Sequence, residues 1–502
     1  MPQSHLDVLI VGAGLSGVGT AVHIRKICPD FKMAILEGRS RPGGTWDLFR
    51  YPGIRSDSDM YTLGYSFKPW THPKAIADGP SIRSYIEDTI QEYDLNPLIQ
   101  YQQRVLSANW DSSSGLWRLR VRNGETGRVR QLSCRFLIGC CGYYRYEHGY
   151  DPDFPDQERY QGLRIHPQLW PEDLDYTGKK VVVIGSGATA VTLVPAMAGK
   201  ADKVTMLQRS PSYVASVPSE DRLAQWLMRH FPDSWVYRTI RTRNILFSMG
   251  IYQLCQHAPE TMRHLLLQRI KGLLPHPDDI KHFSPSYNPW DQRLCAVPNG
   301  DFFSALRTGK ARVVTGSIQR FYEHGIELAS GERLEADIIV TATGLDIQIL
   351  GGIELSVDGK PVDPSEKMYY KGAMVEDVPN FAMVFGYTNS SWTLKADLIG
   401  DYIARLLRFM HSRQYQQCTP RNQDKTIEPL PFIQMSSGYI QRAVNRIPRQ
   451  GDRAPWRLYQ NYIKDWWQFK KHELDDGILV FNQAARVDNV VESFRSTAEM
   501  PG

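Results

Sequence analysis

The chain is poor in cysteine, and its cysteines follow no pattern that would bind a metal or build a disulfide framework. They are scattered without a CxxC pair, at Cys28, Cys134, Cys140, Cys141, Cys255, Cys295 and Cys418. An odd, scattered set in a large chain is typical of a reducing compartment, and it offers a zinc ion no ligand cluster. We therefore expect a cytoplasmic protein without a metal site.

Long apolar runs and a strong charge of one sign are also absent. No segment approaches the roughly 20 apolar residues of a membrane span. A predicted strand begins within a few residues of the N-terminus, so we expect no signal peptide. The net charge of +5 is small for 502 residues, which gives no support to nucleic-acid binding. We expect a globular protein whose contact with a membrane is at most peripheral, and its oligomeric state stays open.

The sequence does contain two glycine-rich segments of the same kind, about a domain's length apart. Residues 8–17 read VLIVGAGLSG, and residues 181–190 read VVVIGSGATA. Both fit the fingerprint of a Rossmann unit, in which such a loop joins a strand to a helix and binds a dinucleotide. One fingerprint is a weak signal. Two indicate two dinucleotides held side by side, which favours an enzyme that pairs a flavin with a nicotinamide.

Hydrophobic patterns around the fingerprints support two such units. An apolar run at 6–11, helical spacing at 15–26 and a second apolar run at 32–37 form a complete βαβ unit. The same strand–helix–strand order recurs over residues 180–207. The chain is also too long for a single ordinary core. We predict an α/β fold with two Rossmann-like dinucleotide-binding domains and a helical insertion in the second.

The first fingerprint carries the features of a flavin site. Gly12 permits a tight turn, Gly14 lets the backbone approach a pyrophosphate, and Gly17 lets the helix pack closely on the strand. Glu37 follows at the distance where a carboxylate accepts hydrogen bonds from ribose hydroxyls, and it would repel a 2′-phosphate. FAD or NAD fits this unit, and a later strand that closes the site favours FAD. The predicted contacts are Gly12, Gly14, Ser16, Gly17 and Glu37.

The second fingerprint differs from the first at the position expected to meet the ribose, which is where NADPH differs from NADH. Gln208 occupies the position that corresponds to Glu37, and Arg209 and Ser210 follow it. Loss of the carboxylate and gain of a guanidinium suit a 2′-phosphate, so we predict NADPH rather than NADH. The predicted contacts are Gly185, Ser186, Gly187, Ala188, Thr189, Ala190, Arg209 and Ser210.

These assignments predict a division of the chain. The apolar strand at 336–343 is ended by Gly344, and Asp346 follows. In flavoproteins of this type such a strand returns to the first domain, so we expect the same here. The predicted parts are an FAD-binding domain of residues 1–150 and 336–502 with a C-terminal segment, an NADP-binding domain of residues 151–220 and 284–335, and a helical insertion of residues 221–283.

Two longer motifs resemble one flavoprotein family. Residues 43–57, GGTWDLFRYPGIRSD, match the GGxWxxxx(F/Y)PGxxxD signature of the Baeyer–Villiger monooxygenases, which are class B flavoprotein monooxygenases. Residues 160–171, YQGLRIHPQLWP, resemble their FxGxxxHxxxWP signature, with Tyr160 and Pro167 as departures. Stretches such as NPWDQRLC and GYTNSSWTLKAD are similar to the ethionamide-activating branch of this family. We interpret His166 of the second motif as structural, coupling the two domains.

The resemblance implies an NADPH- and O2-dependent conversion of ketones to esters or lactones through a flavin C4a-peroxide. Sulfides or thioamides would be S-oxygenated as a side activity. Arg293 resembles the catalytic arginine, whose permanent charge stabilises a developing anion. Asp57 resembles the aspartate that steers this arginine and holds the nicotinamide amide, and Asp59 is expected to be structural. Further implied cofactor contacts are Gly44, Thr45, Trp46, Asp47, Leu48, Arg55, Ser56 and Val105.

Three alternatives remain beside this interpretation. The first is a flavin monooxygenase that acts mainly on nitrogen or sulfur, which would share both fingerprints. The second is a disulfide reductase, for which the adjacent Cys140 and Cys141 are badly spaced. The third is a binder of membrane surfaces, because residues 261–274 form a basic, apolar-faced helix candidate; a helix that roofs the substrate channel is the competing interpretation.

Overall fold

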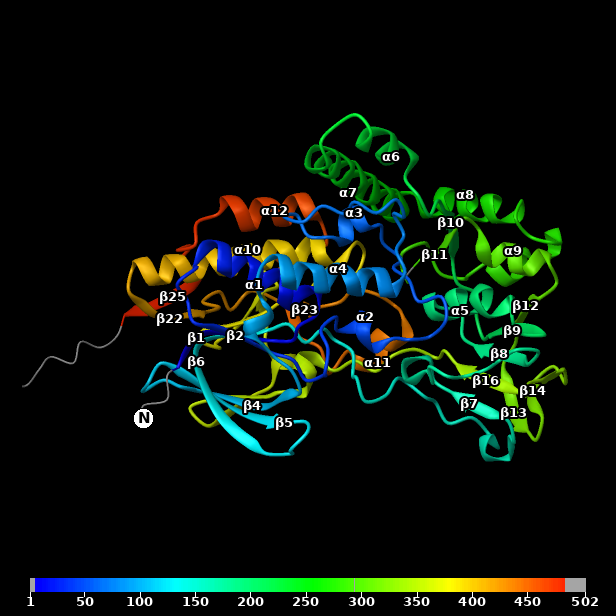
Figure 1. Ribbon diagram of the computed structural model, residues 1–502, viewed down its shortest axis with the longest axis horizontal. Helices are drawn as coiled ribbons and strands as arrows, with labels where there is room; N and C mark the ends of the chain where they lie inside the picture. Colours follow the sequence, from blue (N-terminus) through cyan, green and yellow to red (C-terminus); the bar gives the residue numbers. More distant parts are fainter. Residues whose placement is uncertain (1–4, 293, 484–502) are drawn as a thin grey trace, which may run out of the picture.

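The computed structural model describes residues 5–292 and 294–483. Figure 1 shows two α/β units side by side: the first contains the N-terminal strands and the helices of the C-terminal third, and the second contains residues from the middle of the chain. Each unit has its own apolar core, and a group of helices lies across the top of both.

A mixed sheet forms the centre of the first unit. Its parallel strands are β1 (Leu6–Val11), β2 (Met33–Leu36), β3 (Ile99–Gln100), β6 (Val129–Gly139) and β21 (Phe381–Met383). The antiparallel strands β4 (Gln103–Asp111) and β5 (Leu116–Asn123) extend it beyond β6. On one face, α1 (Leu15–Ile27) packs against α10 (Trp392–Ser412) and α4 (Gly79–Glu92).

Shorter elements complete this unit. They are α2 (Thr45–Leu48), α3 (Met60–Leu63), β17 (Glu354–Val357), β18 (Lys360–Val362), β19 (Tyr369–Tyr370), β20 (Met374–Val375), β22 (Tyr415–Pro420), β23 (Pro429–Pro431), α11 (Gly438–Ala443), β24 (Arg449–Gly451), α12 (Tyr462–Lys471) and β25 (Leu479–Gln483).

The second unit is built on a parallel sheet. Its strands run in the spatial order β12 (Ala311–Thr315), β9 (Lys203–Gln208), β8 (Lys180–Ile184), β16 (Ile338–Thr341) and β7 (Leu163–Ile165). Helices α5 (Ala188–Ala198) and α9 (Asp301–Arg307) pack on it. Beside this sheet lie β10 (Val214–Val217), β11 (Cys295–Pro298), β13 (Ile318–Tyr322), β14 (Gly325–Leu328) and β15 (Arg333–Glu335).

One expectation about the topology is wrong. The strand predicted at 336–343 was expected in the first unit, but β16 pairs in parallel with β8 and β7 of the second sheet. An apolar run has the same pattern in either buried parallel sheet, so the sequence does not specify its neighbours. The chain crosses back just after this strand, where Leu345, Gln348 and Leu350 line a cavity between the two units.

The inserted helices connect the two units. Helices α6 (Arg222–Met228) and α7 (Asp233–His257) bury residues in the core of the first unit, whereas α8 (Pro259–Lys271) buries Ile270 in the core of the second. Arg241 anchors α7: its buried guanidinium donates to the carbonyl oxygens of Tyr61 and Gly64, each at 2.7 Å. It also lies 3.9 Å from the Asp397 carboxylate of α10.

Replacing Arg241 by methionine is expected to lower the free energy of unfolding by about 3–5 kcal/mol, because it leaves two buried carbonyl oxygens without their guanidinium donor and removes the positive charge beside the buried Asp397 carboxylate. Arg243→Met is the control, since Arg243 lies two residues further on the same helix and makes a partly exposed ion pair with Asp221; its loss should cost less than about 1 kcal/mol. Urea unfolding followed by circular dichroism measures both. Equal losses would contradict the anchoring role.

The same cluster has a predictable pH dependence. Burial opposes the ionised form of Asp397, but the hydrogen bond from His23 at 2.6 Å and the nearby Arg241 lower its pKa from 3.8 to about 2. A carboxyl with a lowered pKa stabilises the fold fully above its unfolded value. That contribution is therefore lost as pH falls through about 2.

Candidate functional site

A cavity of about 480 Å³ lies where the two units meet. Its wall includes Gly12 and Gly14 from the first fingerprint and Thr189 from the second. It lies beyond the carboxyl ends of β1 and β6, which is where parallel α/β sheets bind ligands. The fold therefore brings the start of α5, which follows the glycines of the second fingerprint, to the cavity that the first fingerprint lines.

The first fingerprint has the geometry that a pyrophosphate needs. Gly12 has φ +106°, and a Cβ atom there would lie 2.5 Å from the carbonyl oxygen of Cys140. A Cβ on Gly17 would lie 1.8 Å from the carbonyl oxygen of Gly12. Helix α1 begins after Gly14 with no side-chain cap, so its first N–H groups are free to bind an anion. Only glycine fits the turn, and the helix terminus that it creates fits a phosphate.

Glu37 is held where it was predicted to act. Its buried carboxylate accepts hydrogen bonds from the backbone N–H of Ala13 at 2.8 Å and of Arg39 at 2.9 Å. Burial raises the pKa of Glu37, and the two N–H donors oppose that shift. The carboxylate lines the cavity beside Arg39 and Val105. Its fixed orientation suits an acceptor for ribose hydroxyls, so the residues present fit FAD.

The second fingerprint forms the same tight turn, but there is more free space around its second glycine. A Cβ on Gly185 would lie 2.3 Å from the carbonyl oxygen of Ala342, whereas one on Gly187 would meet nothing within 4 Å. The Ser186 hydroxyl donates to the carbonyl oxygen of Ser210 at 3.1 Å, which ties the loop to the end of β9. Arg209, next in the chain, is exposed. The residues fit a nicotinamide dinucleotide with a phosphorylated ribose.

Gln208 occupies the position that corresponds to Glu37 but does not have its role. It is buried, and its side-chain amide donates to the carbonyl oxygen of His282 at 2.7 Å and to the Thr315 hydroxyl at 2.9 Å. The change from a carboxylate to an amide therefore removes a ribose acceptor and adds a structural cross-link.

Most of the implied contacts in residues 43–57 line the cavity, and some do not. Asp47 points away from it: its buried carboxylate pairs with Arg39 and Arg50, each at 2.7 Å. Leu48 packs in the core of the second unit. The predicted site residues on the wall are Gly12, Gly14, Ser16, Glu37, Gly44, Thr45, Trp46, Arg55, Ser56, Asp57, Val105, Ala188 and Thr189. Those off the wall are Gly17, Asp47, Leu48, Gly185, Ser186, Gly187, Ala190, Arg209 and Ser210.

The neighbouring residues Asp57 and Asp59 have different roles. Asp57 lines the cavity. Asp59 caps α3 instead, accepting from the Thr62 backbone N–H at 3.1 Å and from the Asn244 side-chain amide at 2.9 Å. This agrees with the structural role expected for Asp59. Arg55, also on the wall, forms an ion pair with Asp301 of the second unit. Arg293, the predicted catalytic arginine, lies outside the described residues.

His166 has the contacts of a structural residue. Its ring lies against Gly149, and its Nδ1 accepts from the Gln168 backbone N–H at 3.2 Å. Its Nε2 is 3.1 Å from the carbonyl oxygen of Gly344, which requires a proton on Nε2. Burial lowers the pKa of His166, so the neutral ring is favoured.

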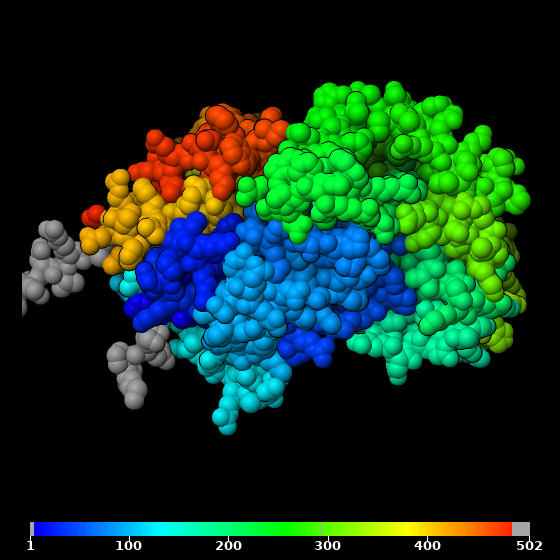
Figure 2. Space-filling view, turned by 45° about the horizontal axis from the view of Figure 1, so that its top comes forward, coloured from blue at the N-terminus to red at the C-terminus, as the bar shows by residue number. Residues whose placement is uncertain are grey.

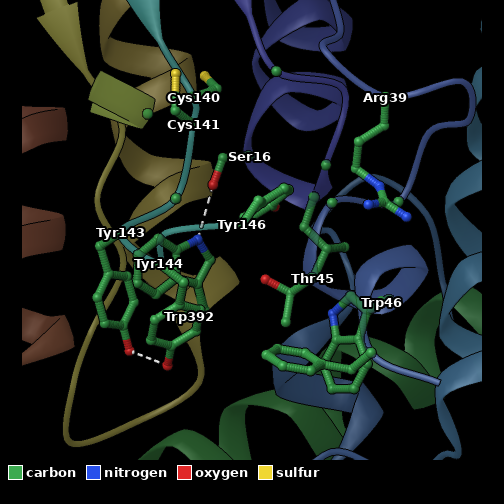
Figure 3. A pocket seen from close by; sticks show the side chains of 18 of the residues that line it. Ser16, Arg39, Thr45, Trp46, Cys140, Cys141, Tyr143, Tyr144, Tyr146 and Trp392 are labelled. Carbon is green, nitrogen blue, oxygen red and sulfur yellow. Dashed lines mark hydrogen bonds between the residues drawn. The ribbon is translucent and has the colours of Figure 1, made fainter. Parts of the chain in front are cut away.

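Sequence reasoning missed an aromatic wall on one side of the cavity, formed by Tyr143, Tyr144 and Trp392. Tyr143 stacks on Trp392 with ring centroids 5.3 Å apart, and the two tyrosine hydroxyls are 2.7 Å from each other. The Trp392 indole N–H donates to Ser16 of the first fingerprint at 2.8 Å. Figure 3 shows this wall opposite Thr45 and Trp46. The pair Tyr143 and Tyr144, a few residues after the end of β6, was the available signal, because strand ends meet the ligand in such sheets.

The two cysteines beside this wall are unsuited to redox exchange. Burial raises the pKa of Cys140 well above its usual range and that of Cys141 to about 12. The thiolate is the reactive form, so both stay protonated and inert. Neither is in a disulfide. This argues against the disulfide reductase alternative.

Two dinucleotide-binding units that share one cavity, without a redox dithiol, define the class of flavin- and nicotinamide-dependent oxidoreductases. Comparison with known proteins narrows this class to a family. A family model described as flavin-binding monooxygenase-like matches residues 65–262, and one for an NAD(P)-binding Rossmann-like domain matches residues 10–71.

Several curated relatives are similar over almost their whole length. The chain is 53% identical over 489 residues to the putative FAD-containing monooxygenase MymA of Mycobacterium tuberculosis, covering 96% of this chain and 99% of that protein. It is 50% identical over 483 residues to the probable FAD-binding monooxygenase AlmA of Acinetobacter baylyi, covering 96% and 97%. It is 49% identical over 479 residues to the FAD-containing monooxygenase EthA of M. tuberculosis, covering 95% and 98%. The chain belongs to the FAD-containing monooxygenase family.

Solved structures agree on the fold. A steroid monooxygenase bound to NADP superposes with a TM-score of 0.70 at 22% identity, covering 83% of this chain and 88% of that one. An open form of cyclohexanone monooxygenase gives 0.72 at 20% identity, covering 83% and 90%. The relatives confirm the predicted class of FAD-containing monooxygenases, and the solved structures confirm the α/β fold with two dinucleotide-binding units.

Proposed function

We propose that this protein is an NADPH- and O2-dependent Baeyer–Villiger monooxygenase that converts ketones to esters or lactones. S-oxygenation of sulfides or thioamides is the proposed side activity. The observation that carries the proposal is the shared cavity, whose wall combines Gly12 and Gly14 of the first fingerprint and Thr189 of the second with Asp57 of the GGxWxxxx(F/Y)PGxxxD signature. The curated relatives named FAD-containing monooxygenases and the steroid and cyclohexanone monooxygenase folds support it.

Each group of residues has a separate task in this proposal. The first fingerprint and Glu37 bind the adenosine and pyrophosphate of FAD, with Val105 at the adenine end. Thr45, Trp46 and the aromatic wall enclose the flavin ring and exclude water. When bound, FAD takes hydride from NADPH and activates dioxygen. Asp57 orients the nicotinamide amide and steers Arg293, whose fixed positive charge stabilises the anion that develops on the substrate.

Oxygenation in the presence of ¹⁸O2 tests the proposal. The FAD-loaded enzyme, NADPH and an aliphatic methyl ketone should yield an ester with one labelled oxygen, while the other atom of dioxygen leaves as water. NADPH consumption should equal ester formation. Oxidation of amines or sulfides without any ester from a series of linear and cyclic ketones would instead favour the alternative, a flavin monooxygenase acting mainly on nitrogen or sulfur.

Replacing Arg209 by glutamine is expected to raise KM for NADPH about 10- to 100-fold with little change in kcat, because a charge-assisted contact to the 2′-phosphate is lost. KM for NADH should not change. Lys203→Gln is the control, since Lys203 is exposed at the opposite end of β9. Steady-state kinetics with both nucleotides measure the effect, and an equal rise for NADH would refute the phosphate contact.

The proposed cellular location is based on the helices and the cysteines of the protein. None of the described helices is long and apolar enough to cross a membrane. The scattered free cysteines suit a reducing compartment, and we propose a cytoplasmic enzyme whose organic substrate is a small ketone or sulfur compound.

A further inference from the structure

Exposed apolar side chains are concentrated on one side of the molecule. Of the 15 large hydrophobic side chains exposed in the described parts of the chain, 11 lie within residues 223–265 and 463–467. All of the tryptophans and phenylalanines exposed within residues 5–292 and 294–483 are among them. Single exposed apolar residues are ordinary, but a contiguous group marks an interaction surface. The group comprises Leu223, Trp226, Phe231, Trp235, Leu246, Phe247, Leu254, Leu265, Ile463, Trp466 and Trp467.

These residues come from elements that lie next to one another. Most belong to α6, α7 and the turn between them, where Phe231 and Trp235 have ring centroids 4.9 Å apart. Helix α12 adjoins α7, because Tyr462 packs beside Met249 and Ile245. Figure 1 places α6, α7 and α12 along the top of the molecule, and in Figure 2 the green surface of α6 and α7 adjoins the orange-red surface of α12. We call the outer surface of these three helices the apolar-basic face.

Positive charge is interleaved with the apolar side chains. Residues 222–257 contain five arginines and one acidic residue, Asp233. Arg241 is buried and Arg243 pairs with Asp221. Within the described residues, the three other arginines of this segment form no ion pair: Arg222, Arg229 and Arg238. An arginine at an interface with anionic lipid gains roughly 1 kcal/mol, a little over fivefold in affinity. A second copy of this chain would instead present the same positive charge.

Helix α8, predicted from the sequence as the amphipathic candidate, contributes little to this face. Ile270 is buried in the second unit, and Leu266 and Leu267 are only partly exposed. Its apolar stripe is thus largely covered by protein. Of the 11 exposed apolar residues in this group, all but Leu265 of α8 belong to α6, α7, α12 or the turn between α6 and α7.

The face also lies close to the cavity. On its inner side, α7 holds the segment that lines the cavity, through Arg241 to the carbonyl oxygen of Tyr61 and through Asn244 to Asp59. Leu63 of that segment is on the cavity wall. If the protein binds a surface through this face, its cavity lies near that surface.

We propose that the apolar-basic face docks on the surface of an anionic phospholipid bilayer, without crossing it, with Trp226, Trp235 and Phe247 entering the headgroup region. Exposed aromatic side chains combined with unpaired arginines are what an interfacial helix uses to bind such a surface. The bilayer thereby delivers lipophilic substrates beside the cavity.

Sedimentation of the FAD-loaded protein with vesicles tests this. The protein should pellet with phosphatidylcholine vesicles that contain phosphatidylglycerol, not with pure phosphatidylcholine, and binding should fall as salt rises. The double substitution Arg229→Gln/Arg238→Gln should weaken binding by about 25-fold at low salt. Arg120→Gln/Arg122→Gln on the exposed face of β5 is the matched control and should bind normally.

A second measurement locates the contact. Vesicles with brominated acyl chains should quench the tryptophan fluorescence of the protein, and Trp226→Phe/Trp235→Phe should lose part of this quenching while it still binds. Trp226→Ser/Trp235→Ser/Phe247→Ser should lose binding about tenfold or more, with Leu163→Ser/Leu169→Ser as the control. Retained flavin and an unchanged melting midpoint show that each variant is folded.

Three outcomes would overturn the proposal. They are failure to pellet with anionic vesicles, equal binding by the face variants and the unsubstituted protein, and a self-associated protein in ultracentrifugation that the serine variants dissociate without any vesicle binding. Turnover of a short, water-soluble substrate should be unaffected by every variant, so a failure of the proposed oxygenation is seen separately.

Discussion

Replacing Gly17 by alanine is expected to yield protein without flavin. The added Cβ would lie 1.8 Å from the carbonyl oxygen of Gly12, and both atoms belong to the backbone. No side-chain rotation can relieve that overlap, so α1 must move away from β1 and take its N-terminal N–H groups out of line with the pyrophosphate. We expect affinity for FAD to fall at least about 100-fold. The ratio of flavin to protein absorbance after purification with added FAD measures the loss.

Two comparisons isolate the cause of this effect. Gly199→Ala adds a Cβ with nothing within 4 Å at a helical φ of −74°, so it should keep its full flavin content. The second fingerprint already carries Ala190 at the third position, and Ala190→Gly should leave FAD binding unchanged. A Gly17→Ala protein that is fully loaded with FAD would contradict the geometry.

Replacing Arg293 by alanine is expected to separate the two half-reactions. Reduction of the flavin by NADPH should continue, because the fingerprints and Asp57 hold both cofactors. Product formation should fall by roughly 10²–10³, the usual consequence of removing one fixed donor from a developing oxyanion. Anaerobic rapid mixing measures the first rate, and gas chromatography of the ester measures the second.

The charge itself is the property under test. Arg293→Lys keeps the charge without the planar fork and should retain intermediate activity. Arg307→Ala, which removes an exposed arginine of α9, should behave like the unsubstituted enzyme. If Arg293→Ala forms product at the normal rate, another residue provides the positive charge.

The sequence predicted the parts of this protein that depend on backbone geometry. The glycines at 12, 17 and 185 are needed because a Cβ at each would collide with a carbonyl oxygen, so their spacing alone identifies the turns. The carboxylate of Glu37 follows from the same logic, since the end of β2 has a fixed place in a βαβ unit.

Features that depend on tertiary packing could not be predicted in this way. The apolar run of β16 fits either parallel sheet, so its assignment to the first unit was wrong. Asp47 lies within a cofactor motif, but its carboxylate turns toward Arg39 and Arg50. Periodicity identified apolar helix faces without showing that α8 is covered and that α6 and α7 are not.

The central claim is that FAD and NADPH occupy one cavity between the two units and exchange hydride there. Anaerobic titration of the FAD-loaded protein tests it most directly. The account predicts that one equivalent of NADPH bleaches the yellow flavin completely, and that NADH does so far more slowly. A flavin that keeps its colour with NADPH, or protein that remains colourless after FAD is supplied, would contradict it.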